Sequence, residues 1–146
     1  MLKTLACVLL VVSFSCVCLA FKDCGSKGGS VQLVDVDGCT KGRCPFNRGT
    51  EATVKFTFKS DVKEDKLKAL VHGIIAHVAV PFPLPNENAC KDSGIKCPIE
   101  SGNTYTYVAT LPVLKEYPQI SLDVKFELKN ENDEDLICVE FPVIIK

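Results

Sequence analysis

The residues best suited to chemistry in this chain are its two histidines, His72 and His77, because imidazole acts as a general base and as a metal ligand. The residues around them are mostly β-branched or aliphatic, which predicts a strand. A separation of five residues on a strand places two side chains on opposite faces. The pair therefore does not indicate a shared metal. We interpret one histidine as a surface residue and the other as an inner residue with its hydrogen bonds satisfied.

Acidic clusters at 35–38 (DVDG) and 130–135 (NENDED) offer the next candidate ligands. Neither has the ordered spacing of oxygen ligands found in a calcium-binding loop, and we interpret the second as a solvated hairpin loop. The sequence contains neither a G-x-S-x-G motif nor a glycine-rich phosphate loop. We therefore expect no catalytic residue, no metal and no cofactor, and we predict that the protein is not an enzyme.

The first twenty residues have the composition of a secretory signal peptide. The basic Lys3 precedes an apolar run at positions 5–12, and the segment ends in the small residue Ala20, where cleavage is expected. The run is too short to cross a membrane. We expect residues 1–20 to be removed on secretion and residues 21–146 to form one extracellular domain.

Six of the nine cysteines lie beyond that segment. An even number of cysteines in an exported protein predicts disulfides, although six cysteines allow fifteen pairings. Two pairs are closely spaced on loops that contain glycine, which leaves the first cysteine for the last. The favoured pairs are Cys39 with Cys44, Cys90 with Cys97, and Cys24 with Cys138. No thiolate then remains as a nucleophile or zinc ligand.

Alternation of apolar and polar residues is the dominant pattern of the chain. Residues 52–59 (ATVKFTFK) and 119–129 (QISLDVKFELK) follow it closely, which predicts half-buried strands. Further strand candidates, separated by Gly, Asn and Asp, are 31–36, 67–80, 104–111 and 136–145. As an alternative, residues 60–70 (SDVKEDKLKAL) open a helix, because Asp61 and Glu64 have the spacing of a capping box.

At least six predicted strands without a recurring helical period indicate a β-sandwich. The antibody-type version is not expected, because the chain contains no tryptophan to pack on its disulfide. The formal net charge is −1, and loss of Lys3 makes it one unit more negative. This charge does not favour a nucleic acid or an anionic membrane as partner.

The apolar segment 78–85 (VAVPFPLP) contains Pro81, Pro83 and Pro85, each of which lacks a backbone donor. Proline is confined to edge strands, strand ends and bulges. We therefore expect this proline ribbon, residues 78–85, to stay out of the interior of a sheet.

Several short motifs occur in a fixed order along the chain: FKDCG, LVHGI, VPFPLP, CKDSGIKCPI, TYTY, LPVLKEYP and LICVEFPV. Together they resemble the ML lipid-recognition superfamily, and within it most closely the family of the soluble sterol carrier of Niemann-Pick disease type C, also called the epididymal secretory protein family. The resemblance covers residues 21–146. It implies an all-β, immunoglobulin-like sandwich of about seven strands in two sheets, with an apolar cavity between them and the same three disulfides. It also implies a ligand-binding mouth lined by Phe82, Val113 and Tyr117.

The function implied by the resemblance is that of a secreted, monomeric carrier. Such a protein binds a sterol or another apolar lipid between its sheets and passes it to a membrane sterol-accepting protein. Alternatives are a carrier of fatty acids or semiochemicals, and an innate-immunity protein that recognises microbial glycolipid. A protease inhibitor or a plain structural domain would have no cavity.

Two departures from the mammalian members make the chain similar to the arthropod branch of the family. Phe126 and Val139 stand where those members have tryptophan, and the chain has no N-x-S/T sequon. Without an N-glycan, secretion is expected rather than glycan-dependent sorting to lysosomes. In this interpretation the prolines keep the ribbon from closing the sheets and leave Phe82 at the mouth. The alternative is that Phe82 only packs a loop onto the core.

Overall fold

The computed structural model describes residues 20–39 and 42–146, so the predicted signal peptide lies outside the described residues except for Ala20. The described residues form strands, turns and loops, and they contain no helix with the length and hydropathy of a membrane span. Their nine strands are β1 (Lys22–Asp23), β2 (Gly29–Val36), β3 (Cys44–Phe46), β4 (Thr50–Ser60), β5 (Lys68–Ile75), β6 (Val78–Phe82), β7 (Thr104–Val113), β8 (Ser121–Lys129) and β9 (Asp135–Ile145).

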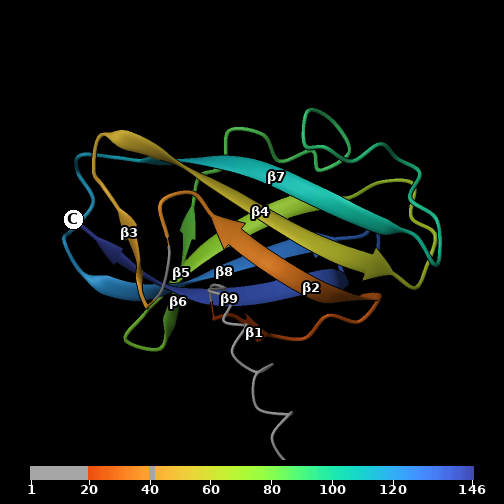
Figure 1. Cartoon of the computed structure of the whole chain (residues 1–146), viewed down its shortest axis with the longest axis horizontal. Helices are drawn as coiled ribbons and strands as arrows, with labels where there is room; N and C mark the ends of the chain where they lie inside the picture. The colour runs from red at the N-terminus through yellow and green to blue at the C-terminus, as the bar shows by residue number, and fades with distance from the viewer. Residues whose placement is uncertain (1–19, 40–41) are drawn as a thin grey trace, which may run out of the picture.

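The strands form two sheets that pack face to face (Figure 1). The larger sheet has the order β1-β9-β8-β5-β6, with β3 also paired to β9, and the smaller sheet has the order β2-β4-β7. All pairs are antiparallel except β3 with β9, which run parallel. The predicted all-β sandwich is confirmed. It has seven strands of five residues or more, and the short strands β1 and β3 were not predicted.

Aromatic side chains join the two sheets in the middle of the core. The Phe56 ring on β4 lies edge-on to Phe126 on β8, with 5.4 Å between centroids, and 5.1 Å from Tyr107 on β7. These rings and their neighbour Phe58 are at most 1% exposed. The apolar face predicted for residues 52–59 is therefore the face that packs between the sheets.

The prediction of a single strand over residues 67–80 is wrong, because the chain reverses at Ala76 and His77. Both residues have positive φ, at 51° and 68°, and Ile75 pairs with Val78 across the turn. A two-residue hairpin turn of this kind normally contains asparagine or glycine. Alanine and histidine give no such signal, so the pattern did not reveal the turn. His77 is exposed at the turn, and the opposite-face argument for the two histidines does not apply.

The helix alternative is also wrong. Residues 61–67 form bends, and Glu64 makes an isolated bridge to Ile99 before β5 begins. The acidic loop is where the pattern predicts it, because residues 130–134 connect β8 to β9.

The proline ribbon begins at the edge of the larger sheet. β6 is the last strand in the sheet order, and Pro81 lies opposite His72 of β5. After Phe82 the ribbon leaves the sheet and continues as a loop. The position at an edge is the one that proline chemistry predicts.

Three disulfides are formed in the pairs that the spacing favours: Cys24–Cys138, Cys39–Cys44 and Cys90–Cys97. The first fastens the residue after β1 to β9 across 114 positions of sequence. The other two close loops with separations of 5 and 7 residues. A cross-link over a longer loop removes more conformational entropy from the unfolded chain.

We expect the double substitution Cys24→Ser, Cys138→Ser to lower the free energy of unfolding by about 4 to 5 kcal/mol in the chain-entropy account. Cys90→Ser with Cys97→Ser is the matched control, with an expected loss of about 2 kcal/mol for its short loop. Urea unfolding at equilibrium measures both. Equal losses in the two variants would contradict a dominant role for the long-range bridge.

Candidate functional site

A small apolar cavity is lined by residues of both sheets, among them Phe46 of β3 and Ile145 near the C-terminus. β3 and the C-terminus lie at the same end of the sandwich (Figure 1). Its volume is about 20 Å³, which is space for a single water molecule. The lining residues are Phe46, Val71, Phe82, Pro83, Leu111, Pro112, Val113, Tyr117, Leu122, Val124, Val143 and Ile145. None of them is charged, and the Tyr117 hydroxyl is their only polar side-chain group.

The structure brings Phe82, Val113 and Tyr117 together at this one cavity. The rings of Phe82 and Tyr117 are stacked, with centroids 5.2 Å apart and planes inclined by 14°. Both residues are half-buried, whereas Val113 is only 3% exposed and lies in the inner wall. The stacked pair therefore separates the cavity from solvent.

Gly73 on β5 and the loop after β7 position the stacked pair. A Cβ atom at Gly73 would lie 2.9 Å from Phe82 Cζ and 2.8 Å from Leu122 Cδ1, so only glycine allows the ring to approach the sheet this closely. The Tyr117 N–H donates to the Leu114 carbonyl at 3.1 Å. Burial, with the neighbouring Glu116 carboxylate, raises the pKa of the Tyr117 hydroxyl. The hydroxyl therefore remains neutral at physiological pH.

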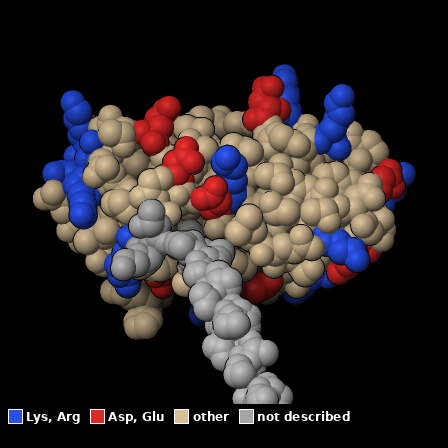
Figure 2. Space-filling model, in the orientation of Figure 1, with Lys and Arg blue, Asp and Glu red and all other residues tan. Residues whose placement is uncertain are grey.

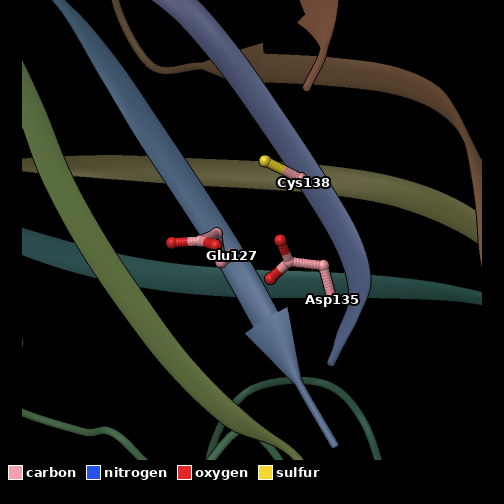
Figure 3. A group of neighbouring side chains, drawn as sticks. All are labelled: Glu127, Asp135 and Cys138. Atoms are coloured by element: carbon pink, nitrogen blue, oxygen red, sulfur yellow. The ribbon is translucent and has the colours of Figure 1, made fainter. Parts of the chain in front are cut away.

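A group of possible metal ligands lies outside the cavity. Glu127 on β8 and Asp135 and Cys138 on β9 have ligand atoms within 4.8 Å of one another (Figure 3). However, the Cys138 sulfur is bonded to Cys24 and is not a thiolate. Lys129 Nζ lies 3.5 Å from Glu127 Oε2 and 3.2 Å from Asp135 Oδ1, so an ammonium group already forms ion pairs with both carboxylates. These residues do not fit a metal centre.

Glu127 has one of the most buried carboxylates in the described part of the chain, with a side chain 7% exposed. Burial raises its pKa, and its hydrogen bond with Asp135 raises it further, while Lys125 and Lys129 oppose the shift. His72 Nδ1 lies 3.7 Å from Glu127 Oε1 but has no hydrogen-bond partner among the described residues. The expectation of an inner histidine with satisfied hydrogen bonds is therefore wrong for His72.

Comparison with known proteins now adds to this geometry. Residues 19–145 match the ML domain family. The chain belongs to the ML domain family. It is 43% identical over 144 residues to NPC intracellular cholesterol transporter 2 homolog a of Drosophila melanogaster, covering 97% of this chain and 96% of that one. It is 46% identical over 125 residues to NPC intracellular cholesterol transporter 2 of Danio rerio, covering 86% and 83% of the two chains.

A solved structure shows the same fold in this ML domain family. The crystal structure of a Niemann-Pick type C2 protein from Japanese carpenter ant matches with a TM-score of 0.82 at 36% identity, covering 88% of this chain and 100% of that one. The resemblance indicated by the sequence motifs is therefore confirmed.

The motifs indicated three of the residues that line the cavity, and other lining residues were missed. Leu122 and Val124 lie on the apolar face of the predicted strand 119–129, so alternation could have indicated them. Phe46 had no signal, because β3 is only three residues long and pairs in parallel with the distant strand β9.

We expect the Glu127→Gln variant to have a higher free energy of unfolding than the natural protein. The difference should grow as the pH rises. The folded pKa of Glu127 is raised, so its contribution to stability is fully present below the unfolded pKa and is lost as pH rises through the folded pKa. Glutamine stays neutral and avoids this loss. Urea unfolding from pH 4 to pH 8 measures the effect.

The control for this experiment is Glu100→Gln, at an exposed residue. The difference between Glu127→Gln and the natural protein should grow with pH, while that of the control should not. The same pH profile in both variants would show that burial of Glu127 has no special effect.

Proposed function

We propose that the protein is a secreted carrier, not an enzyme, that binds a sterol or another apolar lipid between its sheets, with entry between Phe82 and Tyr117. The observation that carries this proposal is the uncharged cavity closed by two partly exposed aromatic rings. The names of the fly and zebrafish relatives, which are cholesterol transporters, support it. The composition of residues 1–20 supports secretion.

Lipid binding in this site requires the cavity to enlarge. Pockets for small molecules have volumes of roughly 300–1,000 Å³, whereas this cavity has about 20 Å³. The side of the cavity formed by Phe82 and Pro83 has no backbone pairing to β7, because the two belong to different sheets. Only side-chain contacts must therefore be exchanged when the lipid enters. Each lost contact is replaced by an apolar contact with the ligand.

Apolar burial alone can drive such binding. About 400 Å² of ligand surface buried at roughly 25 cal/mol per Å² corresponds to on the order of 10 kcal/mol. Association costs at least about 4 kcal/mol, and opening the cavity reduces the gain further. Micromolar affinity is still attainable without a charged contact.

The absence of charge at the cavity favours a sterol over a glycolipid bearing phosphate. The loop between β7 and β8 has one basic residue, Lys115, and a Cβ atom built at Gly49 would lie 3.2 Å from its Cε atom. Lys115 therefore extends along the β3–β4 turn. Figure 2 shows charged side chains of both signs over the visible face, which is not typical of a surface that binds anions. Delivery to a membrane sterol-accepting protein, by a monomer, completes the proposal.

We expect the mature protein to bind dehydroergosterol saturably at about one molecule per chain, with little dependence on salt. Apolar burial is insensitive to screening, whereas attraction to a phosphate group is not. Fluorescence titration at low and moderate ionic strength measures this. Loss of affinity between the two conditions would favour the glycolipid alternative, and absence of binding would contradict a lipid carrier.

We expect Phe82→Ala to weaken dehydroergosterol binding by about 1 to 3 kcal/mol, tenfold or more, because it removes one ring of the closing pair. Phe82 is half-buried, so the loss of stability should be small. Tyr117→Ala should behave similarly. Thermal melts and ligand titrations on each variant separate the two effects.

Phe58→Ala is the matched control, because Phe58 is fully buried away from the cavity. It should lower the free energy of unfolding by roughly 3 to 5 kcal/mol and affect binding only secondarily. If Phe82→Ala melts as early as Phe58→Ala and its folded fraction binds sterol at full strength, Phe82 is only a packing residue.

A further inference from the structure

A second hollow, of about 280 Å³, lies beside the cavity along the edge of the sandwich. Its lining residues are Glu51, Leu84, Pro85, Asn86, Asp92, Tyr107, Val108, Ala109 and Thr110. The cavity and the hollow share two walls. Residues 82–83 of the ribbon and 111–113 of β7 line the cavity, and residues 84–85 and 107–110 line the hollow. We call this line between the ribbon and β7 the seam.

Tyr107 lines the hollow, and its hydroxyl has no hydrogen-bond partner among the described residues. Its ring packs in the core, 5.1 Å from Phe56 and 5.5 Å from Phe126, and the residue is 1% exposed. The fully buried polar side-chain atoms that lack a hydrogen bond among the described residues are His72 Nδ1 and Asp135 Oδ1. The Tyr107 oxygen is not among these buried atoms and makes no hydrogen bond within the described residues, so part of its surface is accessible. Tyr107 is also one of the residues that line the hollow.

A tyrosine hydroxyl at the end of a buried ring normally has a hydrogen-bond partner, so the lack of one among the described residues is unusual. Burial raises the pKa of Tyr107, and no hydrogen bond contributes to the shift. The hydroxyl is therefore neutral at physiological pH. It can both donate and accept a hydrogen bond with a ligand group.

The other polar groups of the hollow are acidic or neutral. Glu51 and Asp92 carry carboxylates and Thr110 a hydroxyl, and no lysine or arginine is among the lining residues. The Asn86 side-chain amide donates to the Lys91 carbonyl at 2.7 Å and is already paired. A hydroxyl or ammonium group would find acceptors here. An anion would meet two carboxylates and no cation.

We propose that the hollow beside Tyr107 is a subsite for the polar end of an amphiphile, a hydroxyl or an ammonium group, whose apolar part lies along the seam in the cavity. This inference rests on the proposed function, because the apolar part needs the cavity. It specifies the ligand further: long-chain or polycyclic alcohols and amines bind, and ionised carboxylates and phosphates of the same apolar size bind less well.

The test uses the full mature protein and an apolar fluorescent probe without a hydroxyl or a charge, 1-N-phenylnaphthylamine. Dodecanol, dodecylamine and dodecanoate compete with the probe at neutral pH. We expect the alcohol and the amine to displace it at concentrations at least about threefold lower than the carboxylate. Equal competition by all three would overturn the subsite while leaving lipid binding intact. If neither the probe nor any of the three binds, the proposed function fails as well.

Tyr107→Phe removes the hydroxyl and keeps the ring in the core. We expect it to weaken dodecanol and dodecylamine by about three- to tenfold, the value of one hydrogen bond, with probe affinity unchanged. An unchanged alcohol affinity in the folded variant would overturn the role of Tyr107. A merely structural role would lower probe and alcohol affinity together.

Glu51→Gln and Asp92→Asn test the charge preference without touching the core. Asp92 has positive φ, a conformation that asparagine also adopts readily. Each change should reduce the ratio of amine to carboxylate affinity by about threefold or more, while Glu100→Gln, at an exposed residue outside the lining, should leave it unchanged. An amine-to-carboxylate ratio that stays constant in both variants would overturn the proposal.

Discussion

The contact between the two sheets is made by apolar side chains, and the rest of the structure depends on it. Backbone hydrogen bonds hold each sheet together, but β7 and β8 belong to different sheets and meet only through residues such as Tyr107 and Phe126. In the middle of the sandwich this contact is a cluster of aromatic rings at most 1% exposed. Toward the β3 end aliphatic residues and the Phe82–Tyr117 pair replace them. The same kind of interaction therefore stabilises the fold and, at one end, lines the cavity in which we propose that the ligand binds.

Much of the fold could be predicted from the sequence because one face of most strands is buried and the other is not. Alternation located the strands at 52–59 and 119–129, because a strand with one buried face has an apolar residue at every second position of its sequence. The turn at Ala76 and His77 left no such trace. Its left-handed conformations are imposed by the pairing of β5 with β6, which overrides local preference. β3 is a pairing between segments about a hundred residues apart, and a three-residue segment carries too little pattern to reveal it.

The candidate site was predictable to a different extent. Phe82, Val113 and Tyr117 came from the order of motifs, and the structure places all three at one cavity. The volume of that cavity could not be read from composition, because it depends on how closely side chains from six strands pack. Nor could the pattern show that Tyr107, which is buried in the core on β7, also lines a second hollow. Such properties arise only when the two sheets are brought together.

The covalent and hydrogen-bonded restraints leave the seam as the part of the sandwich that is easiest to open. The Cys24–Cys138 bridge lies at the β1–β9 edge of the larger sheet, and the other two bridges close short loops, so none joins the ribbon to β7. Prolines remove donors from the ribbon at 81, 83 and 85, which prevents it from extending the smaller sheet by pairing with β7. Strand separation at the seam therefore breaks no disulfide and no sheet ladder. Residues 82–83 of the ribbon and 111–113 of β7 meet there through apolar side chains, and beside them the Val108 N–H donates to the Ser93 carbonyl at 2.8 Å. The lipid entry that we propose would therefore exchange mainly apolar contacts at the cavity end of the seam.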